Sequence, residues 1–176
     1  MMSNKYSSSK KDFLKNEIWI LAWAGASQRA NIFPKDMDEK SRIIKRAEIK
    51  EIVFKVFAQF ELLERISDDL VINKISYLVK RFNNRGISFN VGHAQKLINL
   101  LLKYYWCSGW LKNEPPHCPI DRIILTKAKI KDNGKTPSWT KINNIKIYKK
   151  YIEELKNIAA PKSLAVWELE SFNRRN

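Results

Sequence analysis

The chain has 176 residues and a mass of 20.7 kDa, which is enough for one domain with a substantial core. Five glycines and six prolines are roughly half of the average usage, too few turn formers for a β-sandwich, a propeller or a many-stranded barrel. The 33 lysine and arginine residues outnumber 18 acidic residues, and the formal net charge is +15. We therefore expect an all-α protein with a polyanionic partner, because cations that displace counterions from phosphates gain affinity without reading sequence.

The lysine excess also has a plainer explanation, a lysine-biased composition in a chain rich in Lys, Ile and Asn. The two cysteines, Cys107 and Cys118, are too few for a four-thiolate iron–sulfur cluster and do not suggest a disulfide framework. The first residues lack the apolar core of a signal sequence, and the longest apolar stretches, such as residues 18–26, are too short to span a bilayer. We therefore expect a cytoplasmic protein with no membrane association.

Apolar periodicity predicts a single helical domain over residues 12–176, after a disordered polar tail over residues 1–11. The length of the second predicted helix indicates a bend or break near Lys50. The clearest apolar stripe belongs to the fourth predicted helix, which ends near Cys107. In chain order, the expected helices cover about residues 12–27, 37–66, 68–82, 91–107, 144–159 and 161–172.

Two connections in this pattern carry unusual composition. Residues 108–118 form an irregular loop that contains Gly109 and two prolines, and Pro119 marks the expected start of a further short helix. Residues 127–150 contain eight lysines and only one acidic residue, Asp132. We expect this lysine-rich segment to contact phosphates, through Lys146, Lys149 and Lys150 in particular.

One stretch carries the strongest chemical signal: a connector, a helix that begins Val91-Gly92-His93-Ala94-Gln95-Lys96, a Gly- and Pro-containing loop, and Pro119-Ile120-Asp121. It resembles the helix-hairpin-helix DNA glycosylase superfamily, and is most similar to the short archaeal 8-oxoguanine DNA glycosylases. The resemblance covers about residues 83–125. The compact Pro-Gly-x-Gly turn of the standard hairpin is missing, and only Gly86 and Gly92 remain in a longer connector.

The resemblance implies a helical fold of two small lobes with a cleft between them. It implies excision of a damaged or modified base from DNA, in repair or in defence against phage DNA, without a metal or organic cofactor. The catalytic residues would be Asp121 and Lys96. With the charge pattern, it assigns DNA binding to a further set of residues, namely Arg85, Gly86, Gly92, His93, Lys103, Lys146, Lys149 and Lys150.

The chemistry of base excision gives these two residue types definite roles. Breaking an N-glycosidic bond develops positive charge on the sugar, which a carboxylate such as Asp121 stabilises. An unprotonated amine such as Lys96 can attack the anomeric carbon and form a Schiff base that permits strand cleavage. His93, one turn before Lys96, is a candidate for the neighbouring cation that would favour the unprotonated amine. Each residue also has a structural interpretation: Asp121 complements a helix dipole, and Lys96 is one lysine of many.

The aromatic residues and the possible metal ligands near this stretch are weaker evidence for a site than Lys96 and Asp121. Trp106 and Trp110 flank the loop before Asp121 and are candidates for stacking on an extruded base. The spacing of His93, Cys107, His117 and Cys118 matches no common zinc pattern, so no metal is expected.

Two alternatives to a glycosylase remain open from the sequence. One is a non-catalytic nucleic-acid-binding protein, a regulatory or phage-defence component that uses its lysine-rich surface alone. The other is a helical protein-interaction domain whose basic charge is incidental. The sequence favours a monomer without deciding the oligomeric state, and it does not identify the base.

Overall fold

The computed structural model describes residues 3–28 and 30–171. Over these residues the chain forms seven α-helices and one 3-10 helix, and its only β-type pairing is an isolated bridge between Asp132 and Lys135. The prediction of an all-α fold is therefore confirmed. The elements are α1 (Ser3–Ser27), α2 (Glu39–Glu61), α3 (Asp68–Asn83), α4 (Val91–Cys107), α5 (Arg122–Lys127), the 3-10 helix η1 (Trp139–Lys141), α6 (Ile145–Ala159) and α7 (Leu164–Ser171).

Most of the helices begin where a short polar side chain satisfies a free backbone N–H group. Such N-cap residues stabilise a helix start because the first four N–H groups have no partner within the helix. The side-chain oxygen of the residue before the helix accepts a hydrogen bond from a first-turn N–H in six helices, with Asp38, Ser67, Asn90, Asp121, Asn144 and Ser163 as the caps.

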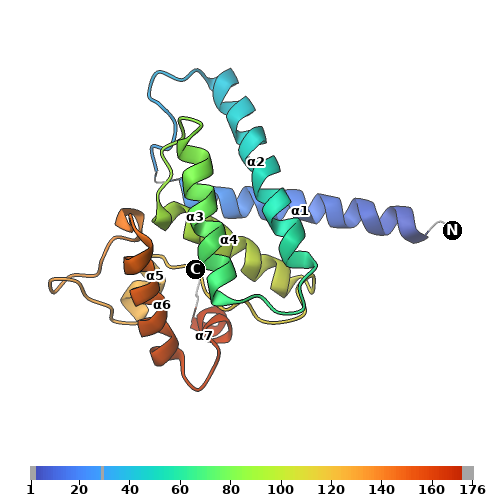
Figure 1. Cartoon of the computed structure of the whole chain (residues 1–176). Helices are drawn as coiled ribbons and strands as arrows, with labels where there is room; N and C mark the ends of the chain where they lie inside the picture. The colour runs from blue at the N-terminus through green and yellow to red at the C-terminus, as the bar shows by residue number, and fades with distance from the viewer. Residues whose placement is uncertain (1–2, 29, 172–176) are drawn as a thin grey trace.

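Helix α4 lies at the centre of the fold and packs against α1, α3, α6 and η1. Helix α7 packs against α5 and α6, and this group lies beside the four longer helices (Figure 1). One cluster of buried apolar side chains includes residues from all seven α-helices and from η1. None of the helices in the described residues has the length and apolar content needed to cross a bilayer.

The N-terminal segment differs from the sequence-based expectation. Helix α1 begins at Ser3, so residues 3–11 are helical and not a disordered tail; residues 1 and 2 lie outside the described part. No glycine or proline interrupts this segment. Lys11 and Lys15 place their Nζ atoms 3.4 Å and 2.8 Å from the carboxylate of Glu61 at the end of α2. These ion pairs connect the first half of α1 to the rest of the molecule.

Three other element boundaries also differ from expectation. Helix α2 runs through Lys50 without a break and ends at Glu61, five residues earlier than expected. Helix α5 begins at Arg122 and not at Pro119, because Asp121 caps it and the backbone of Ile120 is held by the Gln95 side chain. The last predicted helix begins later, at Leu164, and its expected end at Phe172 lies outside the described residues.

Candidate active site at Lys96 and Asp121

The buried amide of Gln95 joins α4 to the segment that precedes α5. Its Nε2 donates a hydrogen bond to the carbonyl oxygen of Ile120 over 2.8 Å, and its Oε1 accepts one from the Ile120 N–H over 3.0 Å. Ile120 therefore has both backbone groups satisfied by one side chain, although it belongs to no regular element. Since Gln95 precedes Lys96 and Ile120 precedes Asp121, this contact aligns the two candidate catalytic residues.

The structure brings Lys96 and Asp121 together. The Nζ atom of Lys96 lies 3.5 Å from Oδ2 of Asp121, and the two side chains are only 13% and 14% exposed. Oδ1 of Asp121 accepts the N–H of Ile124 over 3.1 Å, so the carboxylate caps α5 with one oxygen and faces Lys96 with the other. The catalytic and structural interpretations of Asp121 are thus compatible.

Trp139 of η1 forms the second neighbour of Lys96, whose Nζ lies 4.3 Å from the centre of the indole ring. The face of an indole attracts a cation. Gly92 permits this arrangement, since a Cβ atom there would lie 2.1 Å from the carbonyl oxygen of Trp139. The Gly92 N–H donates to Ile142 over 2.8 Å, and Asn90 Nδ2 donates to the carbonyl of Thr140 over 2.7 Å. These bonds hold η1 over the start of α4.

Lys96 and Asp121 line a pocket of about 620 Å³ between α1, α4 and α7. Its size is within the range of small-molecule sites in proteins, roughly 300–1,000 Å³. Helix α1 contributes apolar side chains such as Leu21 to its wall. Helix α4 contributes the aromatic ring of Tyr104, and α7 contributes the carboxylate of Glu168.

A buried ion pair forms part of the same pocket. Lys103 Nζ lies 2.7 Å from Oε2 of Glu168, and these side chains are 11% and 3% exposed. Burial raises the pKa of Glu168, and its hydrogen bond to Lys103 acts in the opposite direction. The structure does not favour the expected contact of Lys103 with phosphates, because its ammonium group is paired with a buried carboxylate.

Three further residues that were predicted to bind DNA, Arg85, Gly86 and Gly92, lie in the connector before α4 and in its first turn. Gly92 is buried and uses its N–H for Ile142, and the exposed Gly86 uses its N–H for Asn83, so neither amide is available to a phosphate. Arg85 is half-buried and donates to the carbonyl of Arg81 over 3.3 Å.

His93 does not supply a cation to Lys96. Its Nδ1 accepts the Asn90 N–H over 3.4 Å in a capping box, and burial lowers the pKa of His93 below its usual value. The ring packs against Phe89 and Trp139, with centroid distances of 5.5 Å and 6.0 Å. The structure does not favour the predicted role of His93 in DNA binding, since the ring is buried in the core.

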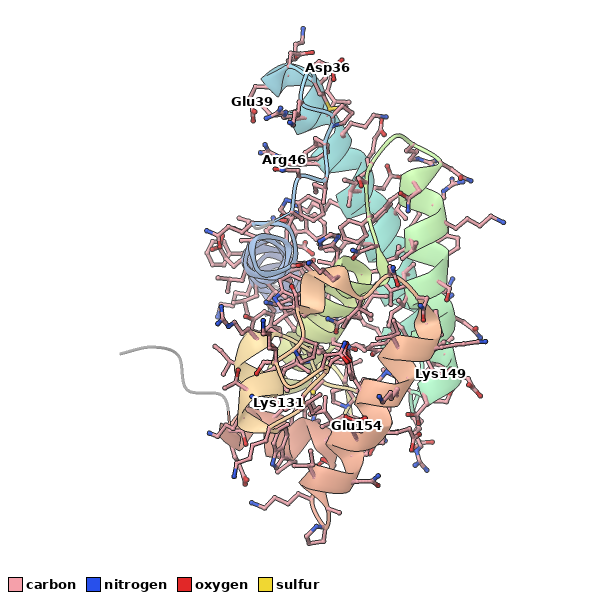
Figure 2. All side chains as sticks on the ribbon, turned by 90° about the vertical axis from the view of Figure 1, so that its left-hand side faces the viewer. Asp36, Glu39, Arg46, Lys131, Lys149 and Glu154 are labelled. Atoms are coloured by element: carbon pink, nitrogen blue, oxygen red, sulfur yellow. The ribbon has the colours of Figure 1, made fainter. Side chains whose placement is uncertain are left out.

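The lysine-rich segment lies on the surface. Lys131, on the loop after α5, and Lys149, on α6, are both exposed (Figure 2). Lys146 and Lys149 form no ion pair within the described residues, and Lys150 lies 3.8 Å from Glu154. The side chains of these three α6 lysines are exposed, and their contact with phosphates stays a prediction.

Neither predicted stacking residue lines the Lys96–Asp121 pocket. Trp110 packs edge-on against Tyr105, with ring centres 5.0 Å apart. Trp106 lines a different pocket, between the loop after α4 and the start of α7. The aromatic ring beside Lys96 is instead Trp139 of η1, and Tyr104 of α4 lines the same pocket.

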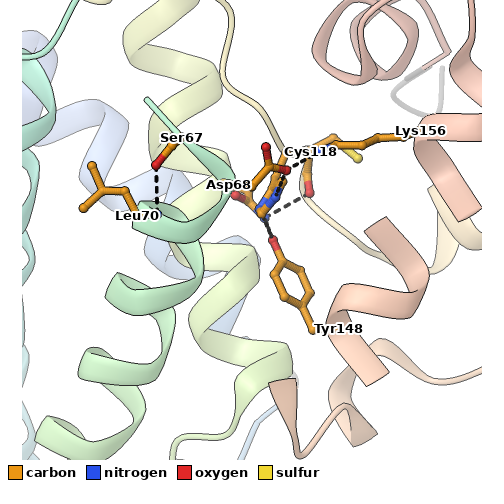
Figure 3. A network of polar contacts seen from close by, with 8 residues as sticks. Ser67, Asp68, Leu70, Cys118, Tyr148 and Lys156 are labelled. Carbon is orange, nitrogen blue, oxygen red and sulfur yellow. Dashed lines mark hydrogen bonds and ion pairs between the residues drawn. The ribbon is translucent and has the colours of Figure 1, made fainter. Parts of the chain in front are cut away.

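A second polar cluster, which the sequence did not indicate, joins Asp68, Tyr148 and Lys156 around the buried ring of His117 (Figure 3). The His117 ring contacts Asp68 through Nε2 at 2.9 Å and the Tyr148 hydroxyl through Nδ1 at 2.8 Å. Asn99 donates to the same hydroxyl over 3.0 Å, and Lys156 also pairs with Asp68. Because the Asn99 Nδ2 donates to the hydroxyl, the hydroxyl donates to His117 Nδ1, and Nε2–H donates to Asp68.

The burial of Gln95 and Asn99, and with it their role in internal hydrogen bonds, could have been predicted from the sequence. They lie one turn apart in a helix whose neighbouring positions are almost all apolar, and both are fully buried. Polar amides in such positions indicate buried hydrogen bonds, because an unsatisfied buried amide is costly. The sequence does not indicate their partners, the backbone of Ile120 and of Cys118.

In the described part of the chain, no group of three or more His, Cys, Asp or Glu side chains is arranged to hold a metal ion. Comparisons with protein-family models, with curated proteins and with solved structures gave no match. Function is therefore inferred from the geometry and charge of the chain itself.

Proposed function

We propose that the protein is a DNA glycosylase that excises a damaged or modified base at the Lys96–Asp121 pocket. The observation that carries the proposal is the 3.5 Å approach of Lys96 Nζ to Asp121 Oδ2 in a pocket of about 620 Å³. An amine and a carboxylate at one point of a pocket are the two groups that base excision with Schiff-base formation requires. The two-lobed, glycosylase-like arrangement of the helices belongs to the same proposal.

In the reaction, the C1′–N bond to the base breaks and the base leaves with the bonding electron pair and takes up a proton. Asp121 faces the positive charge that develops on the sugar and lowers the energy of the transition state. The lone pair of neutral Lys96 forms a bond to C1′. Nζ then loses one proton, O4′ takes up a proton as the C1′–O4′ bond breaks, and the protonated C1′=Nζ Schiff base that results permits strand cleavage.

The groups next to Lys96 influence whether its amine is neutral, as the attack on C1′ requires. The Asp121 carboxylate and the Trp139 ring both stabilise a positive charge on Nζ. A substrate sugar that enters between Nζ and the carboxylate would separate the ion pair, and Nζ must give up a proton before it attacks. If Lys96 keeps its proton, Asp121 instead activates water, and the base is released without a covalent adduct.

Surface charge supports a DNA substrate. The net charge is +15, and the exposed lysines of α6 are outside the pocket, where they can bind the backbone while one base is extruded. The alternative function, non-catalytic nucleic-acid binding, uses the same surface and needs no chemistry at Lys96.

The test uses the purified full chain and a panel of duplexes, each with one oxidised, alkylated or phage-type modified base. Alkali treatment reveals base release, and borohydride reduces the Schiff base to a stable covalent adduct. We expect release from at least one duplex. Asp121→Asn should lower the release rate by about 10²–10³-fold while DNA affinity is retained, because Asn keeps the cap and removes the charge.

Lys96→Gln should abolish trapping, and Lys55→Gln, at an exposed α2 lysine, serves as the matched control. DNA binding without base release from any duplex would favour the non-catalytic alternative. Trapping that survives Lys96→Gln would assign the nucleophile to another amine.

A further inference from the structure

We propose a second binding site, centred on Trp106, that takes an unpaired nucleotide. It is a pocket of about 660 Å³ between the α2–α3 connection, the loop after α4 and the turn before α7. The inference does not depend on base excision at Lys96. Besides Trp106, the ionisable side chains that line it are four cations and one acid, namely Arg65, Lys112, Lys156, Lys162 and Glu114.

The positive charge of this Trp106 pocket is only partly neutralised by acidic side chains. Lys156 pairs with Asp68, and Lys162 pairs with Glu170. Arg65 and Lys112 are exposed and form no ion pair within the described residues. Two cations therefore remain for an anionic ligand beside a single carboxylate, that of Glu114.

The aromatic wall decides the class of anion. Trp106 is half-buried, so its indole is fixed against the core while part of it lines the pocket. A flat aromatic ring beside cations is the combination with which proteins hold single-stranded nucleic acid, the base stacking on the ring and the phosphates pairing with Arg or Lys. A phosphate alone would use the cations and leave Trp106 without a role.

The loop that forms one wall is held in place. Asn113 Nδ2 donates a hydrogen bond to the carbonyl oxygen of Glu64 over 2.6 Å, which ties the loop after α4 to the α2–α3 connection. Leu111 is buried, and Pro115 and Pro116 stiffen the same loop. The walls are thus largely formed before a ligand binds, which lowers the entropy cost of binding.

The pocket also excludes a stacked duplex as its ligand. A ring can stack on Trp106 only if the base has left its partner, so a single strand should bind better than a duplex of the same sequence. Two sources supply such a nucleotide, an unpaired stretch of nucleic acid and a free mononucleotide.

The experiment measures fluorescence anisotropy of a labelled oligothymidylate strand with the full chain, and then with the matching oligothymidylate–oligoadenylate duplex. Trp106→Leu should weaken binding of the strand by roughly tenfold or more, because one stacked base is lost, and Trp106→Phe should retain most of the affinity. The double variant Arg65→Gln, Lys112→Gln should also weaken binding. The controls are Trp110→Leu, which removes a half-buried indole outside the pocket, and Lys40→Gln with Lys55→Gln, which removes the same charge from α2.

Unlabelled thymidine monophosphate distinguishes the sources. Displacement of the strand by the mononucleotide, lost in Trp106→Leu, identifies a free nucleotide as a ligand of the site, and resistance to it identifies the strand. Equal affinity of Trp106→Leu and Trp110→Leu, both shown to be folded by circular dichroism, overturns the proposal. Asp121→Asn should bind the strand normally, so failure of base excision and failure of this site give different results.

Discussion

Asp121 shows how one side chain serves both fold and chemistry. Oδ1 satisfies an N–H at the start of α5, and Oδ2 faces Lys96. Because Asn caps a helix about as well as Asp, Asp121→Asn removes the charge alone. Asp121→Ala also removes the cap, which costs about 0.5–2 kcal/mol. Only the Asn variant therefore separates catalysis from stability.

Both histidines of the chain are buried, and this makes stability depend on pH. Burial lowers the pKa of His93 and of His117 below the ordinary value near 6.5. As pH falls below that value, the two histidines bind protons in the unfolded chain but not in the folded chain, so the free energy of unfolding decreases. Asp68 does not contribute at this pH, because its pKa is held well below the usual range, chiefly by the hydrogen bond from His117.

We expect urea unfolding to show lower stability at about pH 5.5 than at about pH 7.5, with the full stability above the ordinary histidine pKa. His93→Gln should reduce this difference, because Gln can take the place of His93 in the capping box and does not titrate. The loss of the ring contacts with Phe89 and Trp139 should lower stability at both pH values alike. A free energy of unfolding that is constant or higher at the lower pH would contradict the role of the buried rings.

At the scale of elements, the contact between η1 and α4 depends on the missing side chain of Gly92. A methyl group there would meet backbone, the Trp139 carbonyl, and backbone cannot move aside as a side-chain tip can. We expect Gly92→Ala to lower the free energy of unfolding by about 1–3 kcal/mol. It should also weaken base release, since Trp139 would move away from Lys96. Urea denaturation and the release assay measure the two effects.

Gly25→Ala is the matched control for this substitution. There the added methyl would lie 2.8 Å from Cδ1 of Leu100, the end of a flexible side chain, and the positive-φ strain of a turn glycine is not involved. A loss of stability as large as that of Gly92→Ala would show that close packing of helices in general, and not the η1 contact, sets the cost.

The sequence predicted elements better than it predicted contacts. Helix α4 runs over the expected residues because its apolar stripe and its Asn90 cap are local signals. The start of α5 was misplaced because Pro119 is a local signal, whereas the Gln95–Ile120 hydrogen bonds join residues that are 25 positions apart. The same separation explains why Lys96 and Asp121 could be paired only through a family resemblance. No local pattern indicates that Lys103 meets Glu168 of α7.

At the scale of the whole molecule, the lysines fall into two groups, those that pair with acids between helices and those that are exposed at the surface. Several lysines neutralise acids at contacts between helices, such as Lys15 with Glu61 and Lys103 with Glu168. The lysines of α6 and of the loop before it have few such partners, so they carry much of the net charge of +15 at the surface. That distribution predicts where a phosphate backbone should bind.

Binding of duplex DNA should therefore weaken steeply with salt, with a slope of log affinity against log salt of about −0.9 for each phosphate neutralised. Charge reversal of Lys146, Lys149 and Lys150 to Glu should make the slope less negative by up to about 2.7, if each lysine pairs with one phosphate. The loss should be similar for all sequences, because contacts to phosphates carry no base information. Fluorescence anisotropy over a range of salt concentrations measures both quantities.

Charge reversal of three α2 residues, Lys40, Arg46 and Lys55, changes the net charge by the same amount on a different helix. If it changes the slope as much as the α6 variant does, the long-range field of the protein and not α6 contact sets the affinity. Binding that is undetectable or independent of salt would remove every nucleic-acid function proposed for the α6 surface. A slope altered only by the α6 variant places the DNA backbone along that helix.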